Sequence, residues 1–378
     1  MLAERVAAGE LPPVEERLPL NPLVLANMDG SIGKYGGVIR RGMTGLADSA
    51  GPAKMVSETL LFYDPYLNSR VNVAESWDVN EDGTEFRFRL REGMRWSDGA
   101  PFDVSAIRYW FEYELLNETL TPAINPRWKT GEEGTLMELS FPDDHTVVFN
   151  FADPNPLFVY NVAEFSVWNP GHYLVQFHGD LAEDQDGLKE AMATAGFDTW
   201  DQLYSERASF HLNPDLPQLG AWVTQNSMAD ELMVMERNPY CYQVDPEGQQ
   251  LPYIDYMNHR RFETPDVFNM WILNGEIDFQ YRHVSLANYT LFKENEAKGG
   301  YHVEFGANDA TKVFFCNQTC PNPKLREFLR KREVRVAMSH AIDRDMINEL
   351  VYDGMATPRQ YSPSEASPQF YAELSNAY

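Results

Sequence analysis

Residues 74–115 constrain the fold of this chain more than any other part of its sequence. Within this stretch, Phe86, Phe88 and Leu90 alternate with arginines. Apolar residues at every second position are typical of a β-strand with one buried face. The alternation therefore predicts a strand over residues 85–90 that packs against a core.

Two Asp-Gly pairs, Asp82-Gly83 and Asp98-Gly99, flank this predicted strand. Glycine readily adopts the left-handed backbone that many tight turns need, so each pair predicts a turn. After the second turn, Asp103 can serve as the N-cap of a helix. The apolar residues of that helix recur at helical spacing: Val104, Ile107, Trp110 and Phe111.

The remaining sequence predicts a mixture of strands and helices. Strands are predicted at residues 38–43, 136–140, 146–151 and 312–319. Helices are predicted at residues 52–63, 156–163 and 323–341, with a polar helical stretch ending near Ala195. Pro142, Asp143 and Asp144 are predicted to form the turn of a hairpin. Trp96 is predicted to face the same core as Phe86 and Phe88.

Composition describes an acidic globular protein. The chain has 378 residues, 43% of them hydrophobic and 13% aromatic, which is enough for two or more domains with a sizeable core. Its formal net charge is −26, with 57 acidic and 31 basic residues. Such an excess repels nucleic acid and anionic lipid, so neither is expected as a primary partner. The charge is explained by solubility more simply than by attraction of cationic ligands.

The sequence offers no segment that would cross or enter a membrane. No apolar run approaches the roughly 18 residues that a membrane span requires. The first residues, MLAERVAAGELPPVEERLPLNPLV, lack the apolar region of a signal peptide. Two explanations stand at this point: an export signal absent from this sequence, or a cytosolic protein.

No arrangement of residues predicts a catalytic site, a bound metal or a cofactor. The sequence lacks an HExxH motif, a phosphate-binding glycine loop and a GxSxG elbow. Asp78, Glu81 and Asp82 lack the spacing of a calcium loop and are interpreted as a turn. Cys316 and Cys320 form a CxxxC pair, which leaves open a local disulfide, two free thiols or a metal ligand pair.

Several longer motifs together resemble one protein family. The segment from Ala74 to Leu115, AESWDVNEDGTEFRFRLREGMRWSDGAPFDVSAIRYWFEYEL, is similar over more than thirty residues to the signature of family 5 of the extracytoplasmic solute-binding proteins. Further similar segments follow along the chain: VMERNP, DPEGQQLPYID, NGEID and VRVAMSHAIDR. Members of this family are dipeptide-, oligopeptide- and nickel-binding receptors of ABC importers.

The resemblance implies a mixed α/β, two-lobed fold of the periplasmic-binding-protein type, with an extra subdomain in the first lobe. It implies a lead-in over residues 1–35, a first lobe over 36–305 that includes the subdomain at about 70–170, and an incomplete second lobe over 306–378. With that lobe truncated, the fragment is expected to bind ligand more weakly than an intact receptor would, because a one-lobed site buries only part of the ligand. Four apolar residues are expected to stay partly exposed: Val334, Val336, Met338 and Ile342.

The function that the resemblance implies is ligand capture without chemistry. We expect the substrate-binding component of an ABC importer, a monomer that delivers its ligand to the permease subunits. Peptide is the default ligand, and oligosaccharide competes because the chain is rich in aromatic residues. The expected location is periplasmic or extracellular, with anchoring through a lipoprotein signal absent from this sequence. Two alternatives stay open: a secreted acidic glycoside hydrolase, and a ligand sensor on the same scaffold.

The family pattern also suggests where ligand contacts lie. Candidates occur after the first strand, before the Asp64-Pro65 turn, near the crossover between lobes and on the first strand of the second lobe. They are Thr44, Gly45, Glu58, Leu61, Phe62, Trp222, Asn226 and Asn317. For Trp222, packing in the core is an equally strong interpretation.

Overall fold

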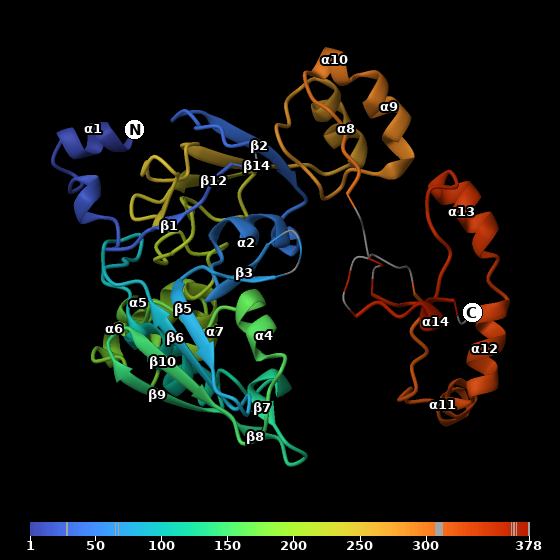
Figure 1. The fold of residues 1–378 in the computed structure, drawn as a ribbon, viewed down its shortest axis with the longest axis horizontal. Helices are drawn as coiled ribbons and strands as arrows, with labels where there is room; N and C mark the ends of the chain where they lie inside the picture. The colour runs from blue at the N-terminus through green and yellow to red at the C-terminus, as the bar shows by residue number, and fades with distance from the viewer. Residues whose placement is uncertain are drawn as a thin grey trace. The chain divides into compact units, whose positions relative to one another are not determined.

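The computed structural model describes residues 1–27, 29–64, 66, 68–306, 313–363, 365, 367 and 369–376. The chain forms two compact units (Figure 1). Unit 1 comprises Met1–Phe268 and Ile277–Arg282, and unit 2 comprises Asn269–Glu276 and His283–Tyr378. The division into a lead-in, a first lobe and a second lobe stays a prediction.

A four-stranded antiparallel sheet, called here the aromatic sheet, is built around residues 74–90 (Figure 1). In spatial order its strands are β5 (Ala74–Val79), β6 (Glu85–Leu90), β10 (Thr146–Asn150) and β9 (Glu138–Asp143). β6 pairs with both β5 and β10. The strand predicted over residues 85–90 is therefore confirmed, and it lies inside the sheet.

One face of the aromatic sheet is buried by interlocking rings. The rings of Phe86, Phe88 and Phe149 all pack around Phe158, which lies on helix α4 (Phe158–Glu164). Their centroids lie 4.9 to 6.3 Å from that of Phe158. Tilted and edge-on ring pairs stabilise a core beyond the area that they bury.

Trp96 belongs to this same core, as predicted. It is 3% exposed and clusters with Phe86 and Phe88. Its ring packs edge-on against Phe102, with centroids 5.4 Å apart.

The turns and the helix that follow β6 also agree with the sequence. Gly83 and Gly99 have φ values of 68° and 90°, which only glycine adopts without strain. Asp103 accepts a hydrogen bond from the Ser105 amide at 2.8 Å and so caps α3 (Val104–Tyr109). A single π-helical stretch, η3 (Trp110–Leu115), continues this helix.

The hairpin between β9 and β10 differs from the prediction in its turn. Asp143 pairs in register with Thr146 as part of β9, so the turn residues are Asp144 and His145. The predicted turn began at Pro142. The Asp143 carboxylate accepts bonds from the His145 amide at 2.9 Å and from the Thr146 hydroxyl at 3.0 Å. Its side chain therefore closes the turn while its backbone stays in the strand.

A second four-stranded sheet of unit 1, called here the methionine sheet, has a different core. In spatial order its strands are β11 (Trp222–Thr224), β12 (Leu232–Arg237), β14 (Tyr256–Arg261) and β2 (Val38–Met43). Neighbouring strands are antiparallel except for the parallel pair β14–β2. The buried cluster on this sheet consists of Met43, Val56, Met228, Met233, Met235 and Met257.

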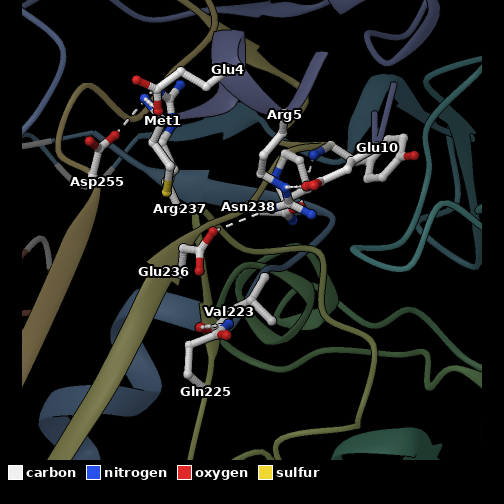
Figure 2. Close-up of polar contacts among 12 residues, drawn as sticks. Met1, Glu4, Arg5, Glu10, Val223, Gln225, Glu236, Arg237, Asn238 and Asp255 are labelled. Carbon is white, nitrogen blue, oxygen red and sulfur yellow. Dashed lines mark hydrogen bonds and ion pairs between the residues drawn. The ribbon is translucent and has the colours of Figure 1, made fainter. Parts of the chain in front are cut away.

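The N-terminal residues are part of unit 1 rather than a free extension. α1 (Leu2–Ala7), η1 (Val14–Glu16) and β1 (Leu23–Val24) follow one another, and β1 pairs in parallel with β13 (Gln243–Val244). Figure 2 shows Arg5 of α1 forming an ion pair with Glu236 of β12, with N···O at 3.3 Å. The buried Arg17 guanidinium donates to the Pro239 carbonyl and to Gln250 Oε1.

The helix predicted at residues 52–63 is shorter and is followed by a strand. Helix α2 (Ala50–Val56) ends before β3 (Leu61–Tyr63), which pairs with β4 (Ser69–Val71). Pro65 and Leu67, between β3 and β4, lie outside the described residues. Leu60 and Leu61 are buried and Phe62 is half-buried. The prediction placed this apolar run in a helix because consecutive apolar residues do not distinguish a strand from a helix.

The remaining elements of unit 1 are short and surround the two sheets. Helix α6 confirms the polar helical stretch predicted to end near Ala195. The elements are η2 (Leu46–Asp48), η4 (Pro126–Trp128), β7 (Lys129–Thr130), β8 (Thr135–Leu136), α5 (Gly171–Leu174), η5 (Val175–Phe177), α6 (Gln185–Ala195) and α7 (Trp200–Arg207).

Unit 2 is helical in its described part. Its elements are η6 (Leu286–Asn288), α9 (Tyr289–Glu294), α10 (Glu296–Gly299), α11 (Pro323–Arg330), α12 (Arg332–His340), α13 (Arg344–Tyr352) and α14 (Ala372–Ser375); α8 (Pro265–Leu273) belongs to both units. Among the described residues from 313 onward, no apolar side chain is buried. Val334, Val336, Met338 and Ile342 are all partly or fully exposed, as expected.

The strand predicted at residues 312–319 is wrong over its described part. Residue 312 lies outside the described residues, and residues 313–317 form no strand. A strand is stabilised by hydrogen bonds to a neighbouring strand, and this segment has no such neighbour in the described part of the chain. The apolar sequence alone could not show that a pairing strand was missing.

Candidate functional site

The carboxyl ends of β2 and β14 form the candidate site. The two strands run in parallel, with Arg41 in register with His259 and Met43 in register with Arg261. Parallel strands bring their carboxyl ends to the same edge of a sheet, and ligands of α/β proteins commonly bind at that edge. Side chains and loops that follow both strands therefore meet here.

Thr44 and Gly45, two of the predicted ligand contacts, form the turn that leaves β2. Gly45 has a φ of 118°, a backbone conformation that favours glycine. The Thr44 amide donates a hydrogen bond to Oδ2 of the buried Asp48 at 3.1 Å. Oδ1 of Asp48 accepts a second bond from Nε of Arg282 at 2.7 Å. The loop thus holds a buried carboxylate at the end of the strand.

Arg41 and His259 lie behind this loop as neighbours on adjacent strands. They are 6% and 1% exposed. Arg41 and Met43 share a face of β2, and His259 and Met257 share a face of β14, because side chains alternate along a strand. Both polar side chains therefore lie on the same face of the sheet as the buried methionines.

The charges of this pair are set by burial. Burial and the nearby Arg41 lower the pKa of His259 to about 3, so its imidazole is neutral near pH 7. Burial also lowers the pKa of Arg41 from its ordinary value, while Asp48 opposes this shift. An arginine nevertheless stays charged in proteins. Within the described residues, neither Nε nor Nη1 of Arg41, nor either ring nitrogen of His259, has a hydrogen-bond partner.

Residues 277–282 lie along the outer edge of β2. The Asp278 carboxylate pairs with the Arg40 guanidinium, and the Asp278 amide donates to the Arg40 carbonyl at 2.9 Å. The Gln280 side chain both accepts from the Gly42 amide and donates to its carbonyl, each at 3.2 Å. The side chains of Asp278 and Gln280 thereby form hydrogen bonds with backbone groups of β2, which lies at the edge of its sheet. Phe279, in the same segment, lies with its ring centroid 5.6 Å from Cζ of Arg41.

Glu58, another predicted contact, lies in a separate buried network. Its Oε2 accepts hydrogen bonds from Asn72 Nδ2 and from the Tyr242 hydroxyl, each at 2.8 Å. The Tyr242 hydroxyl is also 2.7 Å from Asn72 Oδ1. Burial raises the pKa of Glu58 to about 7, although both hydrogen bonds act in the opposite direction. The partners of this carboxylate are thus all supplied by the fold.

Leu61 and Phe62 follow Glu58 on β3 with opposite environments. Leu61 is fully buried in the aromatic core, and Phe62 is half-buried and in register with Arg70 of β4. Leu61 is therefore held by packing, while part of Phe62 stays accessible.

Trp222 and Asn226 lie at the other edge of the methionine sheet from β2. Trp222 is half-buried against the methionine cluster, and its Nε1 has no partner among the described residues. Asn226 closes the β11–β12 hairpin: its amide donates to Asp230 and to the Leu232 carbonyl, and its Oδ1 accepts from the Val234 amide at 2.7 Å. Its polar atoms are used by that hairpin.

Gly220 explains why the chain before β11 can approach helix α2. A Cβ atom at this position would lie 2.5 Å from the Val56 carbonyl oxygen, so a larger residue would force the backbone apart. The segment before Trp222 and the end of α2 before Glu58 are thus held in direct contact.

Asn317, the eighth predicted contact, belongs to unit 2. It is exposed, and its Oδ1 accepts bonds from the Thr319 amide at 2.9 Å and the Thr319 hydroxyl at 3.0 Å. Within unit 1, Thr44 and Gly45 thus lie at the strand-end site, and Glu58, Trp222 and Asn226 lie in other surroundings. That any of these eight residues touches the ligand remains a prediction.

Sequence reasoning missed Arg41, Asp48, His259 and Arg282. Arg40 and Arg41 form an unusual basic pair on an otherwise apolar strand, and that pair was the available signal. His259 and Arg282 lie more than 200 residues further along the chain, and only the pairing of β14 with β2 brings them to the same edge.

Other classes of site receive no support from the described residues. They contain no group of three or more histidine, cysteine or carboxylate side chains that could hold a metal ion. Cys241, Cys316 and Cys320 are all free thiols. Within the same residues, no helix combines the length and apolar character needed to span a bilayer.

The family model for bacterial extracellular solute-binding proteins, family 5 Middle, matches residues 70–378. The chain belongs to this family. This match confirms the resemblance noted in the sequence. Members of the family are periplasmic or extracellular binding proteins. The predicted mixed α/β fold of the two-lobed binding-protein type is confirmed by the structural neighbours described next.

Three relatives show the range within this family. The chain is 27% identical over 409 aligned residues to the periplasmic alpha-galactoside-binding protein of Rhizobium meliloti strain 1021, covering 99% of this chain and 56% of the relative. A solved oligopeptide-binding protein, OppA, matches with a TM-score of 0.82 and 34% identity over 99% of this chain and 60% of its own. MelB from Agrobacterium fabrum C58, solved with stachyose, matches with a TM-score of 0.72 and 25% identity. The match covers 95% of this chain and 55% of MelB.

The chain therefore spans little more than half the length of these relatives. Their names describe binding proteins and no enzymes. They bind two chemically different ligand classes, peptides and galactosides, on the same fold. The fold alone consequently does not decide which class this chain receives.

Proposed function

We propose that this protein is the substrate-binding component of an ABC importer, which captures a peptide or an oligosaccharide and delivers it to the permease subunits. The observation that carries the proposal is the match to an oligopeptide-binding protein over 99% of the chain with a TM-score of 0.82. The galactoside- and stachyose-binding relatives support oligosaccharide as the second ligand class.

The strand-end site suits this role because it offers binding groups and no reacting groups. Backbone amides, a buried carboxylate and arginines can fix the polar groups of a ligand. Ligand binding would then select a closed form of a two-lobed receptor, and the permease would distinguish that form from the open one. Thr44 and Gly45 are the predicted contacts best placed for this, since they form the turn at the end of β2.

A glycoside hydrolase is the alternative from a different class. It would need two catalytic carboxylates facing one substrate, about 5–10 Å apart. Burial raises the pKa of both Glu58 and Glu114 to about 7. Each of them, however, is held by an asparagine and a tyrosine of the fold: Glu58 by Asn72 and Tyr242, Glu114 by Asn169 and Tyr204. Such partners support structural roles. A ligand sensor on the same scaffold differs from the proposal only in its partner.

Titration calorimetry tests the proposal. The protein is titrated with stachyose and, separately, with a pool of short peptides, and the ligand is recovered and weighed by mass spectrometry. Saturable heat with an unaltered ligand supports a binding protein. Heat that continues with turnover, or shortened products, would instead establish the hydrolase. No saturable heat with either ligand class contradicts the proposal.

Two finer points belong to the same proposal. We infer that the protein acts as a monomer outside the cytoplasm, held to the membrane by a lipoprotein anchor. Light scattering of the purified protein tests the first point. Metabolic labelling of the native protein with a fatty acid tests the second, and an unlabelled protein released by osmotic shock would contradict it.

A further inference from the structure

Arg41 is the feature of unit 1 that the fold itself explains least. It is more than nine-tenths buried, yet Nε and Nη1 of its guanidinium have no hydrogen-bond partner in the described part of the chain. Leaving a buried donor unpaired destabilises the folded state, and the cost is larger when the group is charged. A side chain retained under these conditions calls for an acceptor that the described residues do not supply.

We propose that Arg41, with His259 beside it, recognises a carboxylate of the ligand, so that this receptor takes an anionic ligand in preference to a neutral oligosaccharide. The inference rests on the proposed function and narrows its ligand class. A guanidinium is a planar fork whose parallel N–H groups match the two oxygens of a carboxylate. The two donors left unpaired on Arg41, Nε and Nη1, lie on different edges of its guanidinium, so each can donate one hydrogen bond to a carboxylate oxygen.

His259 fits the same ligand group. Its imidazole lies in register with Arg41 on the adjacent strand, and both of its nitrogens are unpaired within the described residues. A neutral imidazole has one N–H donor to offer. Its pKa of about 3 keeps it neutral near pH 7, so it adds a donor beside Arg41 without a second charge.

Asp48 does not replace the ligand carboxylate. Its oxygens accept bonds from Arg282 Nε at 2.7 Å and from the Thr44 amide at 3.1 Å. It is close enough to influence the pKa of Arg41, but it accepts no hydrogen bond from Nε or Nη1. Within the described residues, the Asp48 oxygens thus serve Arg282 and the Thr44 amide, and they leave Nε and Nη1 of Arg41 to another acceptor.

Phe279 covers Arg41 in a way that a side-chain rotation could reverse. Its ring lies over the guanidinium and is nevertheless 64% exposed. Only one face of the ring is thus engaged, and rotation of an exposed aromatic side chain is fast. The neighbouring Asp278 and Gln280 stay bonded to β2, so the segment need not detach for Arg41 to be uncovered.

The experiment compares carboxylate ligands with neutral ones, and its two peptide pools differ in the C-terminal carboxylate alone. The probes are a pool of tri- to pentapeptides of alanine, serine and glycine, the same pool amidated at its C-terminus, trigalacturonate, and neutral stachyose. Calorimetry measures each against the native protein, Arg41→Gln, Arg41→Lys and the control Arg87→Gln. Arg87 is an arginine on the aromatic sheet, paired with Glu85.

We expect the native protein and Arg87→Gln to prefer the carboxylate member of one pair by about tenfold or more. Arg41→Gln should lose that preference without weakening the neutral probe, and Arg41→Lys should lose most of it because the charge stays and the fork is gone. An amidated pool or stachyose that binds as tightly as its carboxylate partner would overturn the inference and leave the binding function standing. So would an unchanged preference in either Arg41 variant. Failure of every probe to bind would instead contradict the proposed function.

Discussion

The aromatic sheet and the methionine sheet have the same number of strands and very different interiors. The aromatic sheet buries rings that pack against one another around Phe158. The methionine sheet buries flexible thioethers together with polar groups that lack partners in the described part of the chain. Those groups belong to Arg41, Trp222, Thr224, Arg237, Asn258 and His259.

The difference separates a scaffold from a site. A core of interlocked rings specifies one arrangement and offers little to a ligand. A core with unpaired polar groups is less stable than it could be, and such sacrifices commonly occur where a protein functions. We therefore expect the aromatic sheet to carry stability and the methionine sheet to carry binding.

The largest expected change in the free energy of unfolding comes from a substitution in the core of the aromatic sheet. Trp96→Ala should lower the free energy of unfolding by about 3–5 kcal/mol, because it removes a buried ring and leaves a cavity. Denaturant melts measure the loss. Val79→Ala, at an exposed position of β5, is the control and should cost less than about 0.5 kcal/mol. A Trp96 variant that loses less than about 1 kcal/mol would show that the ring is not part of the core.

The second effect is pH-dependent and concerns Glu58. Asn72, which leads into β5, and Tyr242 of the aromatic cluster hold its carboxyl group next to the end of α2. Its pKa of about 7 lies above the ordinary 4.5, so the folded state retains a proton that the unfolded state releases between these values. The contribution of Glu58 to the free energy of unfolding is then complete below pH 4.5 and is lost as the pH rises through 7, by about 3 kcal/mol.

Glu58→Gln tests this directly because the amide is neutral at every pH. In the variant, the free energy of unfolding should decline less between pH 4.5 and pH 8 than in the native protein. The remaining decline is due to Glu114, because burial raises the pKa of Glu114 to about 7 as well. Glu132→Gln, in an exposed loop, should leave the decline unchanged. An identical decline in the native protein and the Glu58 variant would mean that Glu58 is ionised in the folded state.

A smaller effect is expected at the hairpin of the methionine sheet. Asn226→Ala removes the side-chain bonds that close the β11–β12 turn. Since hydrogen bonds contribute about 1 kcal/mol each and partly re-form with water at an accessible turn, we expect a loss of about 1–2 kcal/mol. Asn226→Asp keeps the oxygen that accepts from Val234 and should recover part of the stability in thermal melts. A neutral Asn226→Ala would indicate that the side chain is available for another role.

The smallest effect is the most informative about Arg41. Arg41→Met replaces a buried charge that lacks partners with the side chain that fills the rest of this core. We expect the free energy of unfolding to stay unchanged or to rise by about 1 kcal/mol, because the desolvation cost of the guanidinium is removed. Met235→Ala, a cavity variant of the same core, should instead lose about 2–5 kcal/mol. A loss above about 2 kcal/mol for Arg41→Met would show that Arg41 holds the fold together.

The aromatic sheet could be predicted from the sequence, and the methionine sheet could be predicted only in part. Alternation at Phe86 and Phe88, the Asp-Gly turns and the Asp103 cap are local signals, and each one specifies its own element. The strand at 38–43 was predicted on the same grounds and is confirmed as β2. Local signals do not say which strands pair, however, so the parallel pairing of β2 with β14 was out of reach.

The candidate site depends on that pairing, which is why most of it was missed. Thr44 and Gly45 were found through a family pattern next to β2. Arg41 was passed over as part of a strand, and His259 reaches it only across a sheet. The predicted strand at 312–319 failed for the complementary reason, since an apolar run needs a partner before it becomes a strand.

Hydrogen exchange with and without ligand tests the separation of scaffold from site most directly. The protein is saturated with whichever of the peptide pool, trigalacturonate or stachyose binds, and amide exchange is followed by mass spectrometry. We predict increased protection at residues 41–48, 257–261 and 277–282, with no change at residues 86–90 and 146–150 of the aromatic sheet. Protection confined to the aromatic sheet, with the ends of β2 and β14 unchanged, would contradict the account.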